Sequence, residues 1–157
     1  WAIHIMLDMP CATIGRAAII GDALHAAETH FGSGAGQAME DAYVLGRLLT
    51  HPSITRENIP QALTAYERVR LGPSTALVAR TRYMSELYEF LDENNLPDGR
   101  HAVMRETDDA ATGVRDEGDD WTTRWGKTVT KQWVWQWDGT PETWWKEAET
   151  ELNKLLA

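Results

Sequence analysis

The residues whose types could do chemistry lie between positions 20 and 41. Asp22 follows Gly21 at the end of the short apolar run Ala17–Ile20, and a glycine-rich segment over 32–36 then opens a helical pattern. Unpaired N–H groups at a helix start favour a flat or anionic ligand, by about 0.3–1 kcal/mol for a negative partner. The spacing Gly-x-Gly-x-Gly, separated from Ile20 by eleven residues, differs from the Gly-x-Gly-x-x-Gly turn of dinucleotide-binding folds. The glycine spacing alone is equally compatible with a binding loop and with a plain helix start.

Other reactive residue types form no convincing set. His25, Glu28 and His30 could bind a metal, but the five-residue step does not place both histidines on one helical face, and no third ligand is suggested nearby. Ser33 lacks the context of a nucleophile elbow. The single cysteine, Cys11, is interpreted as a passive thiol in a loop. We therefore predict no metal site and assign no catalytic residue.

Two strands and a helix are expected to position Asp22 and the glycine-rich segment 32–36. Residues 1–8 partly alternate and predict a strand that ends before Pro10. The run Arg16–Asp22 predicts a buried parallel strand, whose carboxyl end would present Asp22. Residues 23–36 are expected to form a loop, and the helix that follows ends near Thr50. Its predicted apolar stripe consists of Ala35, Ala38, Met39, Ala42, Leu45 and Leu49.

A second helical stretch is expected to open near Asn58, with Pro60 in its first turn. Pro73 should kink or restart it, and the segment 94–99 should end it. The residues expected on one side are Ile59, Leu63, Tyr66, Val69, Leu77, Thr81, Met84, Tyr88 and Leu91.

The last part of the chain combines acidic and tryptophan-rich sequence. Residues 100–120 are polar and acidic and predict a mobile surface loop. Seven of the eight tryptophans follow within 121–156, where i+4 steps from Trp121 predict one helix and Thr140 is expected to cap another. The tryptophans could form an exposed platform for a flat ligand or anchor a helical appendage. The acidic, helical flanks favour the appendage. The residues expected to face inward from the last helix are Trp144, Trp145, Ala148, Leu152 and Leu155.

Composition places the chain among single-domain globular proteins. It has 157 residues and a net charge of −9, which argues against nucleic acid or an anionic membrane surface as a partner. Residues 1–85 carry seven acids and seven bases, whereas residues 86–157 carry seventeen acids and eight bases. The whole acidic excess therefore lies in the second half of the chain. The lone cysteine and the absence of a signal-peptide pattern favour a cytoplasmic location. The first residue is Trp rather than Met, so the sequence is consistent with a segment of a longer protein.

Two runs of the sequence carry a resemblance to a known family. The first contains Gly-Asp-Ala-Leu-His-Ala over 21–26, and the second contains Gly-Ser-Gly-Ala-Gly-Gln over 32–37, then Glu-Asp-Ala and a leucine-rich helix. Together they closely resemble the second flavin motif of the FAD-dependent aromatic-ring monooxygenases, and most of all the salicylate hydroxylase-like branch. The similarity extends to Tyr66-Glu-x-x-Arg70 and, more loosely, to Trp135-Gln-Trp137. Thr29 stands where this family usually has proline.

The resemblance implies a cofactor and a reaction. Asp22, after Gly21, would hydrogen-bond the ribityl or pyrophosphate region of FAD. The N–H groups of Gly34, Ala35 and Gly36, reached through the loop at Gly32, would face the N1–C2=O edge of the isoalloxazine ring. The family reduces FAD with NAD(P)H, captures O₂ as a flavin C4a-hydroperoxide and hydroxylates a small aromatic substrate, so that much of the chemistry belongs to the cofactor.

The resemblance also implies a domain layout. The chain would be mainly α, with one or two short strands, and would form the C-terminal part of an α/β flavin monooxygenase with a Rossmann-like FAD domain. Residues 1–50 would complete the FAD domain, 51–99 would form a helical region, 100–120 an acidic loop and 121–157 a Trp-rich helical appendage. The missing N-terminal part of the same enzyme would then be the principal partner, and the segment alone would be inactive. The alternatives are an inactive interaction module that uses its Trp-rich helices and an aromatic module that binds a carbohydrate or another flat ligand.

Overall fold

The computed structural model describes residues 2–6, 9–91, 121–136 and 140–157. The described chain is mainly helical, as predicted, with one small two-stranded sheet. The elements in chain order are β1 Thr13–Ile14, β2 Ala17–Ala18, α1 Asp22–His25, η1 Thr29–Phe31, α2 Gly34–Leu49, α3 Ile59–Tyr88, α5 Trp121–Trp133, η4 Val134–Gln136 and α6 Pro141–Leu156.

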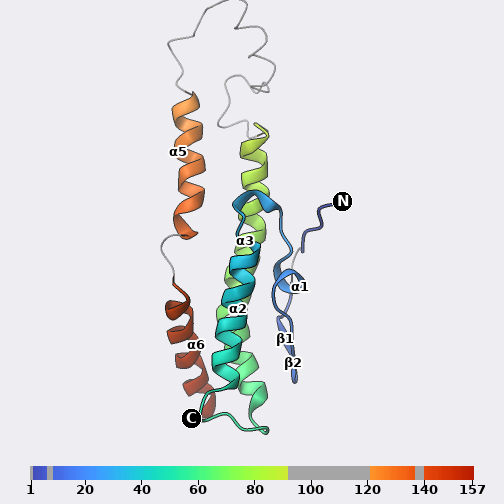
Figure 1. Cartoon of the computed structure of the whole chain (residues 1–157), viewed down its shortest axis with the longest axis vertical. Coiled ribbons are helices and arrows are strands. Elements are labelled where there is room, and N and C mark those ends of the chain that lie inside the picture. Colours follow the sequence, from blue (N-terminus) through green and yellow to red (C-terminus); the bar gives the residue numbers. More distant parts are fainter. Residues whose placement is uncertain (1, 7–8, 92–120, 137–139) are drawn as a thin grey trace, which may run out of the picture.

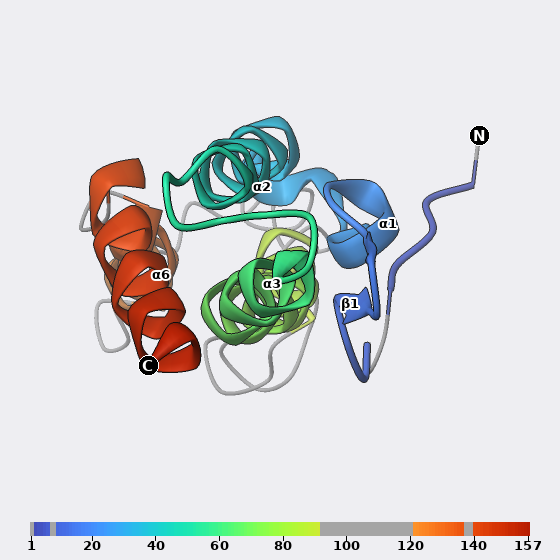
Figure 2. The same cartoon turned by 90° about the horizontal axis from the view of Figure 1, so that it is seen from below.

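The long helix α3 is the axis of the molecule. Figure 1 shows α2 and α6 beside one half of α3 and α5 beside the other half. Seen along the axis in Figure 2, α6, α2 and α3 form a triangle, and α1 and β1 lie on the outer side of α2 and α3. The elements at the start of the chain are therefore fixed against two helices.

The predicted kink at Pro73 does not interrupt α3, which runs as one helix through it. Proline removes one intrahelical hydrogen bond, and apolar packing on both sides of this position compensates for that loss. Asn58 and Pro60 begin the helix as predicted. The segments 94–99 and 100–120 lie outside the described residues.

Two apolar cores lie along α3. The first joins α2, α3, α6 and the segment around β1, and the second joins η1 to the far half of α3 and to α5. The buried residues of the first core are Ala12, Leu24, Val44, Leu48, Ala62, Ala65, Tyr66, Val69, Trp145, Ala148 and Leu152. Those of the second are Phe31, Leu77, Met84 and Leu87.

The strand predictions were wrong in detail. Residues 2–6 form no strand, because no described strand lies beside them; their Met6 N–H donates instead to the Ala26 carbonyl at 2.7 Å. The predicted buried parallel strand Arg16–Asp22 is reduced to Ala17–Ala18, which pairs antiparallel with Thr13–Ile14. Gly15, with φ of +60°, allows the tight turn between them, so the apolar run closes a hairpin.

The tryptophans pack on the preceding helices, which confirms the anchoring interpretation for the described ones. The Trp125 indole N–H donates to the Leu87 carbonyl at 2.8 Å. The rings of Trp133 and Trp135 lie edge-on to Phe31 at centroid distances of 5.2 and 5.8 Å. Thr140 caps α6 as predicted, since its side chain accepts the Thr143 N–H. Trp137 lies outside the described residues.

Candidate functional site

A buried cluster of polar side chains joins α1, α2 and α3, and we call it the Arg70 cluster. The Arg70 guanidinium and the Asp41 carboxylate are both fully buried, with Arg70 Nε 2.7 Å from Asp41 Oδ1. Arg70 also donates from Nη1 to Glu40 at 2.9 Å and from Nη2 to the Gln37 side chain at 2.9 Å. Its guanidinium lies over the Trp144 ring, 5.2 Å from the centroid. One α3 residue thus contacts the first two turns of α2 and the start of α6.

The second oxygen of Asp41 holds the turn that precedes α1. Asp41 Oδ2 accepts the backbone N–H of Gly21 at 3.0 Å and lies 2.9 Å from His25 Nε2. Burial opposes ionisation of Asp41, but hydrogen bonds from His25, Arg70 and Gly21 outweigh it and hold the pKa of this carboxyl below its ordinary value. A charged Asp41 therefore ties the Gly21 turn to α2 and α3 at the same point.

The residues before Arg70 on α3 hold the hairpin. Glu67 Oε2 accepts the backbone N–H groups of Ala12 and Thr13, both at 2.7 Å. The Tyr66 hydroxyl donates to the Ile19 carbonyl at 3.0 Å, and burial raises the pKa of this phenol. Three residues within five positions of one helix thus position both the hairpin and the turn after it.

Gly21 has a specific steric role in this arrangement. Its φ is +59°, a conformation that other residues rarely adopt, and a Cβ added there would lie 3.3 Å from the Cβ of Ala38 on α2. Glycine therefore allows the turn to lie directly against α2. Asp22, the next residue, opens α1 with an exposed side chain. Among the described residues, its carboxylate has no hydrogen-bond or ion-pair partner.

The start of α2 leaves its donors uncapped. Ser33, the residue before the helix, makes no side-chain capping hydrogen bond, and the first turn carries no acid. Gly34 and Ala35 are exposed, and space is open above both Gly34 and Gly36. Gly32 ends η1 in the left-handed conformation, which turns the chain into α2. The N–H groups of Gly34, Ala35 and Gly36 are thus placed to donate hydrogen bonds to an electronegative edge of a ligand.

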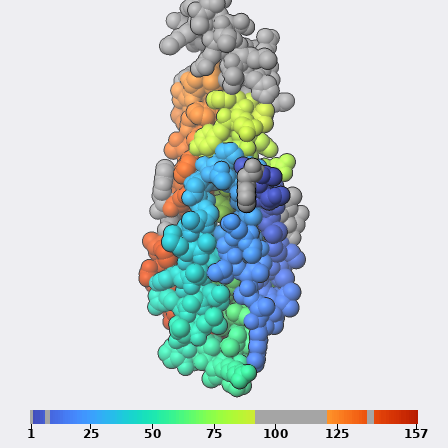
Figure 3. Space-filling view, turned by 45° about the vertical axis from the view of Figure 1, so that its right-hand side comes forward, coloured from blue at the N-terminus to red at the C-terminus, as the bar shows by residue number. Residues whose placement is uncertain are grey.

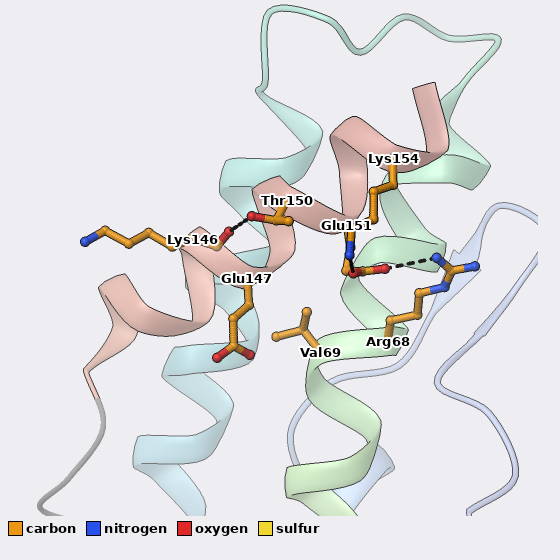
Figure 4. Close-up of a pocket in the computed structure, with 7 residues that line it drawn as sticks. All are labelled: Arg68, Val69, Lys146, Glu147, Thr150, Glu151 and Lys154. Carbon is orange, nitrogen blue, oxygen red and sulfur yellow. Dashed lines mark hydrogen bonds and ion pairs between the residues drawn. The ribbon is translucent and has the colours of Figure 1, made fainter. Parts of the chain in front are cut away.

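A hollow lies beside this helix start. Its volume is about 210 Å³, and it lies between the glycine segment and the tryptophans of η4 and α6. Its lining residues are Gly32, Ser33, Gly36, Gln37, Glu40, Trp135, Gln136 and Trp144. A second hollow, of about 600 Å³, lies between α3 and α6 and includes none of the predicted site residues. In Figure 4, Arg68 and Lys154 are both directed at Glu151, so that these three charged groups bond to one another. That groove is therefore a poor candidate for chemistry.

The histidines have different surroundings. His25 is buried in the Arg70 cluster, whereas His30 Nδ1 lies 3.4 Å from Glu28. Over the described part of the chain, no group of three His, Cys, Asp or Glu side chains could hold a metal ion. None of the helices that the structure describes is long and apolar enough to cross a bilayer.

Several known proteins are similar to this chain in sequence. Salicylate hydroxylase of Pseudomonas putida is 42% identical to the chain over 92 residues, which is 59% of this chain and 21% of that protein. The chain is similar to salicylate hydroxylase. The FAD-dependent monooxygenase pigN of Monascus ruber is 38% identical over 113 residues, 66% of this chain and 25% of that protein. These matches confirm the predicted resemblance to FAD-dependent monooxygenases. No protein-family model matches the chain.

A solved structure extends the similarity to nearly the whole chain. It is described as a salicylate hydroxylase substrate complex, with a TM-score of 0.70 and 29% identity to this chain. The alignment covers 94% of this chain and 30% of that one. The chain therefore spans about one fifth of the length of the salicylate hydroxylase it matches in sequence and under a third of the solved one.

Pattern reasoning singled out candidate residues on both sides of the Arg70 cluster and missed the cluster itself. The structure brings Gly21 and Asp22 close to α2, whose N-terminal turn carries Gly34, Ala35 and Gly36. It also shows the Arg70 cluster between them, which pattern reasoning did not assemble. The motifs that carry the family resemblance were the signal that could have located the cluster. Glu40-Asp41 and Tyr66-Glu-x-x-Arg70 supply most of the charged side chains of the cluster.

Proposed function

We propose that this chain is part of an FAD-dependent monooxygenase that hydroxylates a salicylate-like aromatic compound. The observation that carries the proposal is the similarity to salicylate hydroxylase, at 42% identity over 59% of the chain and a TM-score of 0.70 over 94% of it. Because the chain spans a small part of those proteins, it would supply one side of the flavin site and depend on the rest of the polypeptide for the other.

The residues present fit this cofactor. Asp22 has an exposed carboxylate at the start of α1 that no other described residue pairs with, and it is suitable for accepting hydrogen bonds from the hydroxyl groups of the FAD chain. The N–H groups of Gly34, Ala35 and Gly36 would donate to the electronegative edge of the isoalloxazine ring and, with the α2 dipole, stabilise negative charge there. When bound, FAD would supply the redox chemistry of the reaction, with NAD(P)H as the reductant and O₂ as the oxygen donor.

The Arg70 cluster gives these residues their positions. Asp41 holds Gly21 and so places Asp22, while Arg70 holds Gln37 and Glu40 in the first two turns of α2. A site that binds a large cofactor needs supports of this kind, because small shifts of its contact groups weaken binding. The role proposed for Asp41 and Arg70 is therefore positional, and neither would touch the substrate.

The experiment uses the native polypeptide that contains residues 1–157, purified and scored for flavin absorbance and for salicylate-stimulated NADH oxidation. Asp22→Asn should lower the FAD content of the purified protein, because it removes the charged acceptor. The matched control is Glu89→Gln, which removes an exposed acid at the C-terminal end of α3. Unchanged FAD content in Asp22→Asn would refute the role assigned to Asp22. A native polypeptide without flavin would refute the proposed function.

A further inference from the structure

The loop between α1 and α2 has an anchor of its own, separate from the Arg70 cluster. The cluster holds the Gly21 turn before α1 and the first turns of α2 from Gln37 onward. The short helix η1 lies between these two points. Within η1, Thr29 is exposed, whereas Phe31 is only 3% exposed. Phe31 is therefore the side chain that fixes this part of the loop to the rest of the molecule.

Phe31 packs both on α3 and on the tryptophans at the end of α5. It belongs to the second apolar core, together with buried residues of the far half of α3. The rings of Trp133 and Trp135 lie edge-on to it, with interplanar angles of 77° and 86°. In Figure 3, the light-blue segment that includes η1 lies against the yellow-green end of α3, with α5 in orange beside that end. Edge-on aromatic pairs are favourable beyond the area that they bury.

Both tryptophans are themselves held by α3. The Trp133 indole N–H donates to the Tyr88 hydroxyl at 3.3 Å. The Arg80 guanidinium lies over the Trp135 ring, 5.6 Å from its centroid. Residues two positions apart face different sides of a regular α-helix. The helix α5 ends at Trp133, however, and the chain continues as the 3-10 helix η4, where both rings reach Phe31. Two rings of one short segment therefore converge on one residue of η1.

Phe31 lies directly before the glycines that lead into α2. Gly32 ends η1 with a φ of +58°, and its N–H donates to the Thr29 carbonyl at 2.9 Å. Ser33 follows, and α2 begins at Gly34. Because only Gly32 and Ser33 separate Phe31 from the helix, a rotation of η1 changes the direction in which the chain enters α2. The orientation of η1 therefore controls where the uncapped N–H groups at the helix start lie.

We propose that Trp133 and Trp135 are positioning residues of the flavin site, which act through Phe31 to set the conformation of η1 and the placement of the N–H groups at the start of α2. The reference to flavin rests on the proposed function, whereas the control of η1 does not. Trp135 also lines the hollow beside Gly32, so the same segment borders the helix start directly. These two tryptophans should therefore matter more for flavin binding than a tryptophan of the same core that does not touch Phe31.

The first test needs no flavin and measures amide hydrogen exchange in the 157-residue chain by NMR. Trp133→Leu should raise the exchange rate of the Gly32 amide by about tenfold, because a loosened η1 opens the hydrogen bond to Thr29. The His25 amide, which donates to the Gly21 carbonyl at 2.9 Å, is the internal reference and should keep its rate.

Trp125→Leu is the matched control for this test. Trp125 belongs to the same helix and core, but its ring contacts are with Tyr88 and Phe90. It should raise the Gly32 exchange rate by a smaller factor than Trp133→Leu does. Equal increases in the two variants would overturn the proposal, because the effect would then come from general loosening of the core.

The second test uses the native polypeptide with its flavin. Trp133→Leu should raise the dissociation constant of FAD by about fivefold and change the visible circular dichroism of the bound flavin. Trp133→Phe, which keeps an aromatic ring against Phe31, should restore both readouts. Trp125→Leu should lower the melting temperature and leave both flavin readouts unchanged. Flavin changes in Trp125→Leu as large as those in Trp133→Leu would overturn the proposal.

Phe31→Leu removes the same contact from the side of η1 and keeps the test usable if Trp133→Leu does not fold. It should reproduce the changes in Gly32 exchange and in FAD affinity, and the double variant should show little further effect. Additive losses in the double variant would overturn the proposal. A native polypeptide without flavin, in which Trp133→Leu still accelerates Gly32 exchange, would refute the proposed function and leave the control of η1 by the tryptophans in place.

Discussion

Replacing Arg70 by methionine tests whether the buried ion pairs hold the site together. Methionine keeps a long, flexible side chain, so the change mainly removes the charge and the donors. Arg70 makes hydrogen bonds to Asp41, Glu40 and Gln37 at 2.7, 2.9 and 2.9 Å, and its side chain is fully buried. The variant would leave the Asp41 carboxylate buried beside α3 without its cation.

The expected cost follows from that uncompensated charge. Breaking a buried pair by removing one partner costs about 3–5 kcal/mol, a large part of the 5–15 kcal/mol that typically separates folded from unfolded states. The matched control is Arg68→Met, two positions earlier on the same helix. Arg68 lies 3.0 Å from Glu151, but its side chain is 50% exposed. Such a surface pair contributes at most about 1 kcal/mol.

The assay is equilibrium unfolding in urea of the 157-residue chain, followed by tryptophan fluorescence and by circular dichroism. Trp144 lies against the Arg70 guanidinium, so the fluorescence also reports the local change. In the double variant, Asp41→Asn should recover part of the loss caused by Arg70→Met, since asparagine can still accept the Gly21 N–H but carries no charge. An Arg70→Met variant as stable as Arg68→Met would refute the assignment of the cluster as the structural centre of the site.

Two further predictions concern the turn and the carboxylate that holds it. Gly21→Ala should destabilise the chain by about 1–2 kcal/mol, from positive φ and from the contact with Ala38. Gly15→Ala, at a similar φ with open space around it, should cost only the backbone part, and equal losses in urea unfolding would rule out the contact. The lowered pKa of Asp41 means that the unfolded state takes up its proton first as the pH falls, near the ordinary carboxyl value of about 3.8. Stability should therefore decrease below about pH 4 and continue to fall until the folded-state pKa is passed. Asp41→Asn should show a shallower decrease in acid unfolding curves, and an unchanged slope would contradict this origin.

The sequence was sufficient to predict the longer helices and to single out Asp22 and the glycines as candidate cofactor residues. Periodicity located α2, α5 and α6 because their apolar residues recur at helical spacing, and the glycines and Asp22 stood out by type. It could not predict that Arg16–Asp22 closes a hairpin, because a short apolar run fits a buried strand and a tight turn equally well. Nor could it predict the Arg70 cluster, since Asp41 and Arg70 lie 29 positions apart and their pairing depends on the packing of two helices.

Helix α3 also has a consequence for how the molecule opens. Its first half belongs to one apolar core and its second half to the other, and Pro73 lies between Val69 in the first and Leu77 in the second. Because proline donates no backbone hydrogen bond, the helix is weakest where the cores meet. Amide hydrogens of the half beside α5 can therefore exchange through local opening while the half that carries Tyr66, Glu67 and Arg70 stays closed. Asp22 and the Arg70 cluster are thus attached to the part of α3 that this opening leaves intact, whereas Gly32 follows η1, whose Phe31 packs on the half that opens.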